Sequence, residues 1–119
     1  MTIIRIFLIL YGIIAISTGF LGIVVKYDPL IPIFEDNSHR FISSIWASTS
    51  LAFFYVAWKP EHTVLFRFLI IALFLGGIVR LAALINYFPD TPTLVTIFLE
   101  LVPTPILWWM HTRYVLGKD

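Results

Sequence analysis

The chain has no cysteine among its 119 residues, and it is poor in charges of either sign. Without cysteine, a disulfide bond, a thiolate nucleophile and a sulfur-ligated metal are all excluded. Charged residues make up 13% of the chain, against about 25% in soluble domains. The net charge is only +1, which gives no clustered positive surface for phosphates. We therefore expect no nucleic-acid partner.

Apolar residues are abundant instead. They make up 60% of the sequence, and the mean hydropathy is +0.95. Soluble domains contain about 45–50% apolar residues. Because so few polar side chains remain to face water, lipid must surround most of this chain. The length suits one compact domain, so we predict a single transmembrane domain over residues 1–119.

Four apolar runs approach or exceed the length of about 20 residues that crosses the hydrocarbon layer. In lipid the backbone polar groups must be satisfied within each segment, which favours helices. The first run is too long for a signal-peptide core of about 7–15 residues, so we interpret it as a retained helix. The sequence predicts an all-α fold, an integral membrane four-helix transmembrane bundle, with helices at 3–25, 38–58, 60–86 and 92–116.

Local signals place the helix ends. Asn37 or Ser38 is expected to cap the second helix. Thr91 is expected to cap the fourth, with Pro92 at its first position and Gly117 at its end. The second and third helices are joined by a short corner, so they must be antiparallel neighbours. The connection at 26–37 contains two prolines, and it either lies over the outer mouth of the bundle or is an ordinary connector.

Lys and Arg are unequally divided between the two sides of the membrane. One side holds both termini together with five basic residues, and the other side holds Lys26 and Arg40. This asymmetry predicts that both termini are cytoplasmic. Interfacial aromatic residues are expected near the span ends. The five basic residues are Arg5, Lys59, Arg67, Arg113 and Lys118, and the aromatic residues are Tyr27, Trp58, Tyr87, Trp108, Trp109 and Tyr114.

Two charges lie inside the predicted spans, Arg80 in the third and Glu100 in the fourth. A charge at the middle of a membrane helix costs about 2.5–3.5 kcal/mol on insertion scales. At a rise of 1.5 Å per residue, Arg80 lies about 9 Å and Glu100 about 12 Å from the outer ends of their helices. Because these helices are consecutive and antiparallel, we predict an ion pair between the two side chains.

Neighbouring residues favour this pair. Pro103 and Pro105 lack N–H groups, which leaves backbone acceptors on either side of Glu100. Gly76 and Gly77 are small enough for another helix to approach closely, near Arg80. Small residues also follow one face of the first helix, at Gly12, Ala15, Gly19 and Gly22.

Arg40 opens a polar edge of the second helix, where a positive charge near the helix start needs an acidic partner. Glu35, Asp36 and Glu100 are the candidates. The sequence thus suggests an outer cluster that is either a structural contact or a ligand, lipid-headgroup or proton site. Its members are Arg40, Arg80, Glu100 and Asn86.

The histidines His39, His62 and His111 are expected to be interfacial, and no pair has a metal-binding spacing. The run Glu35-Asp36-Asn37-Ser38-His39 contains cation ligands, but helix capping is the simpler explanation. No nucleophile motif or phosphate loop occurs. We therefore expect no metal, no cofactor and no catalytic residue.

Three elements of the sequence resemble a known family. They are Asn37-Ser38-His39-Arg40-Phe41, Gly76-Gly77-Ile78-Val79-Arg80, and Glu100 followed by Pro103 or Pro105. The pattern resembles the bacterial family called domain of unknown function 4345. The resemblance implies a small four-helix inner-membrane protein and points to Arg40, Arg80 and Glu100, without an activity. Small multidrug exporters resemble the chain less, because their essential membrane Glu is in the first helix.

Three hypotheses of function remain open. The first is a non-enzymatic accessory or scaffold protein of the cell envelope, with lipids and either a membrane-protein partner or further copies of itself as partners. The second is a small-ligand or lipid binder, or a proton-coupled transporter, that uses Arg80 and Glu100. The third is a membrane enzyme acting on a lipid headgroup, with Glu100 as its base.

Overall fold

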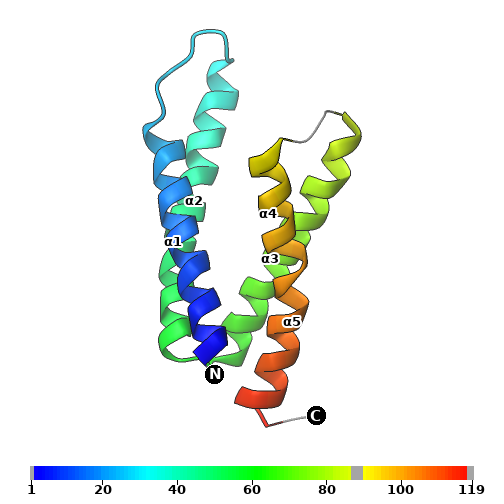
Figure 1. The fold of residues 1–119 in the computed structure, drawn as a ribbon. Coiled ribbons are helices and arrows are strands. Elements are labelled where there is room, and N and C mark those ends of the chain that lie inside the picture. The colour runs from blue at the N-terminus through cyan, green and yellow to red at the C-terminus, as the bar shows by residue number, and fades with distance from the viewer. Residues whose placement is uncertain (1, 87–89, 118–119) are drawn as a thin grey trace. The chain divides into compact units, whose positions relative to one another are not determined.

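The computed structural model describes residues 2–86 and 90–117, and these residues are almost entirely helical (Figure 1). Four stretches are long and apolar enough to cross a membrane: Thr2–Val24, Ile33–Trp58, Thr63–Asn86 and Thr91–Val115. The predicted all-α class with four membrane-spanning helices is confirmed. The elements are α1 (Thr2–Val24), α2 (Ile33–Trp58), α3 (Thr63–Ala83), the 3₁₀ turn η1 (Leu84–Asn86), α4 (Thr91–Leu101), α5 (Pro103–Met110) and the π-helical turn η2 (His111–Val115).

The chain divides into two compact units, residues 2–59 and the part that begins at residue 60. Each unit contains two membrane-crossing segments, α1 with α2 in the first and α3 with α4 and α5 in the second. The two units are described separately here, and the single domain expected from the length stays a prediction.

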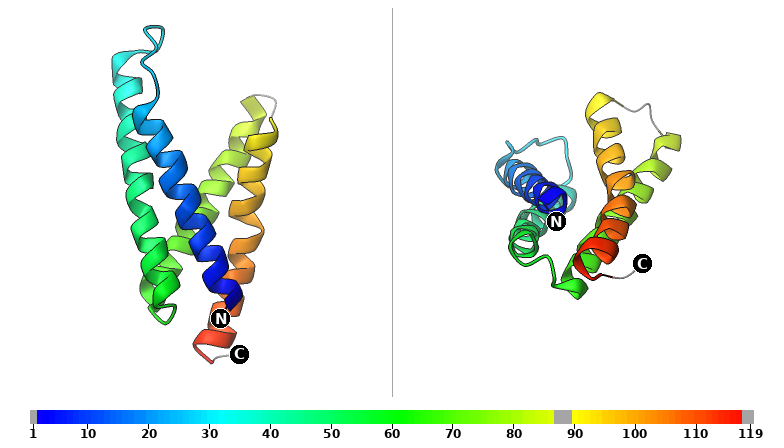
Figure 2. Two further views of the ribbon diagram at one scale, coloured as in Figure 1. Left: turned by 60° about the vertical axis from the view of Figure 1, so that its left-hand side comes forward. Right: turned by 60° about the horizontal axis from the view of Figure 1, so that its bottom comes forward.

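In the first unit α1 packs along α2, and the small residues of α1 make the close approach (Figure 2). A Cβ atom on Gly19 would lie 2.6 Å from the backbone nitrogen of Ala47 and 2.7 Å from the carbonyl oxygen of Ser43. A Cβ on Gly12 would meet the ring of Phe54, and Ala15 is fully buried. The second helix therefore packs against the stripe of small residues that was predicted on the first helix.

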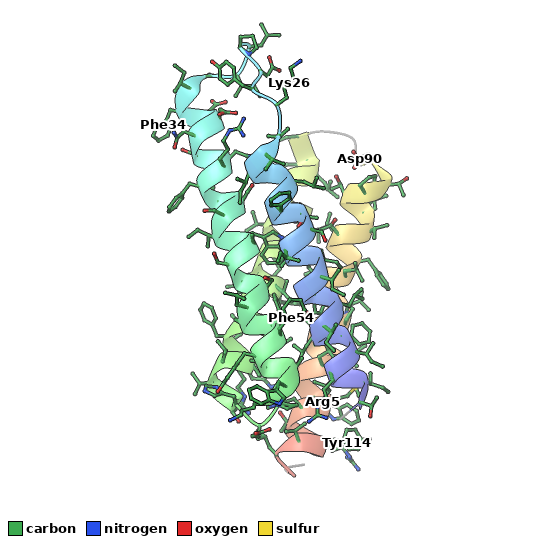
Figure 3. The ribbon with its side chains drawn as sticks, turned by 90° about the vertical axis from the view of Figure 1, so that its left-hand side faces the viewer. Arg5, Lys26, Phe34, Phe54, Asp90 and Tyr114 are labelled. Atoms are coloured by element: carbon green, nitrogen blue, oxygen red, sulfur yellow. The ribbon has the colours of Figure 1, made fainter. Side chains whose placement is uncertain are left out.

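Helix α2 begins at Ile33, five residues before the predicted start, so the prediction of an irregular connection up to Asn37 is wrong. Pro32 has a fixed φ of −55° directly before the helix, and Glu35 lies in the first turn with Asp36. Acidic side chains there interact favourably with the positive end of the helix dipole, which outweighs the capping signal at Asn37. In Figure 3 Lys26 lies on the loop that joins the two helices, and Phe34 lies at the start of α2.

In the second unit α3 begins at Thr63, three residues after the predicted start, because Pro60 belongs to the turn that leads into it. The cap of α4 is Asp90, not Thr91 as predicted: its Oδ1 accepts a hydrogen bond from the backbone N–H of Thr93 at 2.9 Å (Figure 3). Hydrogen bonds from Thr93 lower the pKa of Asp90. Pro92 lies in the first turn of the helix, where its missing N–H costs nothing.

The fourth membrane-crossing segment is broken rather than continuous. Helix α4 ends at Leu101, and α5 begins at Pro103 after a bend at Val102. A proline removes one helical hydrogen bond and crowds the preceding turn, so two of them in this region interrupt the predicted 92–116 helix. Gly117, at φ 69°, follows the last turn as predicted. Tyr87, which is expected at the interface, and Lys118, one of the five basic residues on the side of the termini, lie outside the described residues.

Large apolar side chains are exposed along the helices. Leu51 of α2 is 72% exposed, Phe68 of α3 is 65% exposed and Phe98 of α4 is 57% exposed. Water would make this arrangement unfavourable, whereas acyl chains solvate such side chains well. The exposed surface thus agrees with a multi-pass membrane protein.

Candidate functional site: an ion pair between α3 and α4

An arginine and a glutamate from the two segments of the second unit are in contact. Arg80 lies in the last turn of α3, and Glu100 lies next to the end of α4. The Nε atom of Arg80 is 2.9 Å from Oε1 of Glu100, so the predicted ion pair is present. The two side chains differ in exposure, at 53% for Arg80 and 12% for Glu100. The Glu100 side chain is mostly covered, while about half of the Arg80 side chain is exposed.

The glycine pair of α3 makes room for the glutamate. A Cβ atom on Gly76 would lie 2.9 Å from Oε2 of Glu100. One on Gly77 would lie 2.8 Å from Cδ2 of Leu101 and 2.9 Å from Cβ of Glu100. A larger residue at Gly77 would crowd α4, and one at Gly76 would displace the Glu100 carboxylate. Gly76 and Gly77 lie one helical turn before Arg80. Because they have no side chains, the Glu100 carboxylate can lie close to the α3 backbone.

A hydrogen bond across the bend at Val102 fixes the backbone of Glu100. The hydroxyl of Thr104, which is fully buried, donates a 2.6 Å hydrogen bond to the backbone carbonyl of Glu100. Thr104 lies between Pro103 and Pro105, so this side-chain bond ties α5 back to the end of α4 across the bend. The backbone that carries Glu100 is thus fixed on both sides of the break.

Arg40 has its own acidic partner within the first unit. Its Nε lies 2.9 Å from Oδ2 of Asp36 and its Nη2 lies 3.2 Å from Oδ1, a two-pronged contact within α2. Its Nη1 donates to the backbone carbonyl of Ile23, near the end of α1, at 2.6 Å. Of the three acids that were candidates, Asp36 is the partner. Arg40 thus joins the start of α2 to the end of α1, where a cation suits the helix dipole.

Of the four residues in the predicted outer cluster, only Arg80 and Glu100 contact each other within one unit. Arg80 contacts Glu100, whereas Arg40 is engaged by Asp36 in the other unit. Asn86 is exposed at the end of η1, and its side chain forms no hydrogen bond with the residues described. Whether these residues form a functional site stays a prediction.

The burial of His111 is a feature that sequence reasoning missed. Its expected position at the membrane interface stays a prediction, but only 1% of the residue is exposed. Its ring is stacked on that of Phe66, with centroids 3.9 Å apart and planes 12° apart, and Nε2 hydrogen-bonds to the carbonyl oxygen of Pro60. A carbonyl only accepts, so Nε2 carries the proton. His39 and His62 are exposed.

The geometry around Glu100 indicates what this site can do. The carboxylate contacts the guanidinium of Arg80 and lies close to Gly76. The hydroxyl of Thr104 donates to the backbone carbonyl of Glu100. Among the described residues, the site thus offers charge neutralisation and further N–H groups of Arg80, which suit an acceptor on a partner or ligand.

One family model matches this chain over residues 3–111, and its description is Domain of unknown function (DUF4345). No curated protein and no solved structure matches the chain. The matched region contains α1 to α5, and it includes Arg40, Arg80 and Glu100, on which the resemblance seen in the sequence was based. The chain therefore belongs to the DUF4345 family, whose function is unknown.

Proposed function

We propose that this chain is a non-enzymatic accessory protein of the bacterial inner membrane that binds a membrane-spanning partner at the open side of Arg80. The observation that carries the proposal is the 53% exposure of the Arg80 side chain inside a membrane-crossing segment. In lipid an unsatisfied N–H group costs several kcal/mol, so the exposed donors favour an acceptor from outside this chain. Polar contacts of this kind join helices in membranes.

An anionic small ligand or lipid headgroup is the second candidate for the same position. A planar guanidinium binds carboxylates and phosphates through two parallel N–H groups, and that geometry is compatible with the half-open Arg80 side chain. Glu100 would then hold the arginine in place, because its side chain is mostly covered and already faces Nε.

The two candidates are separated by photo-crosslinking in cells. A photoreactive residue at Val79, which is 68% exposed beside Arg80, is compared with one at Val64, which is 79% exposed at the other end of α3. The proposal predicts a discrete protein adduct at position 79 that disappears in Arg80→Gln and persists in Arg80→Lys. Adducts with lipid or small molecules alone would favour the second candidate, and equal labelling at both positions would contradict both.

We further propose that both termini face the cytoplasm, which the distribution of Lys and Arg supports. Because the chain has no cysteine, single cysteines are unambiguous probes. A cysteine at Lys26 should react with a membrane-impermeant maleimide added outside the inner membrane, and one at Lys59 should not. The reverse pattern would invert the orientation.

A further inference from the structure

An apolar cavity of about 330 Å³ lies along α3 and α5, apart from the ion pair. Its lining includes Ile71, Phe74 and Leu75 from α3 and Thr104, Pro105 and Trp108 from α5. The one hydroxyl among these residues is already used, because Thr104 donates to the carbonyl of Glu100. The lining therefore favours an apolar ligand. The volume is at the lower end of the range of about 300–1,000 Å³ for ligand sites.

A positive charge lies beside Trp108, one of the residues that line this cavity. The guanidinium carbon of Arg67 is 4.8 Å from the ring centroid of Trp108, which also lines the cavity. The buried Nε of Arg67 has no hydrogen-bond partner among the described residues, and no carboxylate in that part of the chain pairs with it. The hydroxyl of Thr112, one turn beyond Trp108, is also buried without a partner.

Position along the helix relates the charge to the membrane. Arg67 lies four residues after Thr63, the first residue of α3, which is about 6 Å into the helix. Ile71 and Leu75 follow at intervals of four residues, so the cavity extends from Arg67 toward the middle of the span. A cation near the interface above an apolar channel matches the order of parts in a phospholipid, with a phosphate at the surface and acyl chains below it.

We propose that this cavity binds an anionic phospholipid, with the phosphate at Arg67 and part of one acyl chain between α3 and α5. A helix from a second copy of the chain fits less well, because a helix with its side chains is about 10–12 Å wide. Such a helix inserts no more than a side chain into a cavity of about 330 Å³. No carboxylate among the described residues pairs with the Arg67 guanidinium, so this cation favours an anion, which a phosphate supplies and an apolar helix face does not.

Native mass spectrometry of the purified chain in detergent tests the proposal with two lipids of identical acyl chains. Dioleoyl-phosphatidylglycerol, which is anionic, should be retained more tightly than zwitterionic dioleoyl-phosphatidylcholine. Arg67→Gln should weaken the phosphatidylglycerol complex about fivefold, the scale of one basic side chain near an anionic lipid surface. Leu75→Trp, which adds bulk to the cavity wall, should weaken both complexes.

Matched controls separate this site from general attraction to lipid. Arg113 also lies near an indole, with its guanidinium carbon 5.7 Å from the centroid of Trp109, but it does not line the cavity. Arg113→Gln and Ile78→Trp should therefore leave retention within about twofold, well below the effect expected at Arg67. Addition of inorganic phosphate should not displace the bound lipid, because the acyl chain supplies part of the affinity.

Several results would overturn the proposal. Equal retention of the two lipids by the unsubstituted protein would remove the role of Arg67, and no effect of Leu75→Trp would remove the cavity. A dimer that Leu75→Trp dissociates, with unchanged lipid retention, would identify a second copy as the occupant. If Arg67→Gln fails to fold by circular dichroism, the comparison of lipids on the unsubstituted chain and the Leu75→Trp variant still decide the question.

Discussion

The contact between Arg80 and Glu100 arises from two depths that can be counted along the sequence. Both residues lie a similar distance from the same end of consecutive antiparallel helices, so their meeting is predictable without coordinates. For Arg40 the sequence narrowed the partner to three acids, and the pair with Asp36 follows from a spacing of four residues within α2. Ion pairs within one helix, or between helices that are consecutive in the chain, can therefore be predicted from residue spacing alone.

The contact of His111 with Pro60 is different, because 51 residues separate the two and no local pattern relates them. The histidine lies in a π-helical turn that directly follows α5, and its ring meets Phe66 at the start of α3. Its burial depends on how α5 leaves the bend at Val102, which the sequence signals only as a break. The burial of His111 was therefore not predictable from the sequence.

Substitution of His111 should measure how much its contacts with Pro60 and Phe66 stabilise the second unit. His111→Ala removes both the ring stacking and the only hydrogen bond described to the Pro60 carbonyl, and we expect a loss of about 1–3 kcal/mol in stability. His111→Phe keeps a stacking ring and should lose less. Thermal unfolding in detergent is the measurement, with the exposed His39→Ala as control. Equal midpoints for His111→Ala and the unsubstituted protein would contradict the assigned role.

At the scale of helices, the number and approximate length of the apolar runs were predictable, and their ends were less so. Helix α2 begins at Ile33 and not at residue 38, because Glu35 and Asp36 after Pro32 are favourable in a first turn and compete with the cap expected at Asn37. The fourth segment broke because Pro103 and Pro105 act together in one turn. In both cases the signal was present in the sequence, and a competing local preference decided the outcome.

Packing of α1 on α2 depends on the absence of a side chain at Gly19. In Gly19→Ala the new methyl group would meet backbone atoms of Ala47 and Ser43, which cannot rotate away. We expect a loss of about 1–3 kcal/mol, the range for an overpacked contact. Ser17→Ala, at an exposed position of the same helix, is the matched control. Thermal midpoints in detergent should separate the two variants, and an unchanged midpoint for Gly19→Ala would show that the helices are not in close contact there.

At the scale of the whole molecule, composition alone predicted a membrane protein, because 13% charged residues cannot cover a surface facing water. The division into two helix pairs was not predicted. It reflects extensive contacts within each hairpin, which form between segments adjacent in sequence. In the first unit the stripe of small residues on α1 supports these contacts, and in the second unit Gly76 and Gly77 do so with the ion pair.

Arg80 and Glu100 neutralise each other between α3 and α4, and thermal unfolding of two variants in detergent tests this contact directly. Glu100→Ala leaves the guanidinium without its carboxylate, and it should lower the midpoint by several degrees. Arg80→Met/Glu100→Leu removes both charges and should unfold at a higher temperature than Glu100→Ala, because no ion is stranded. A double variant as unstable as Glu100→Ala, or less stable, would contradict the pair as the contact that holds these helices together.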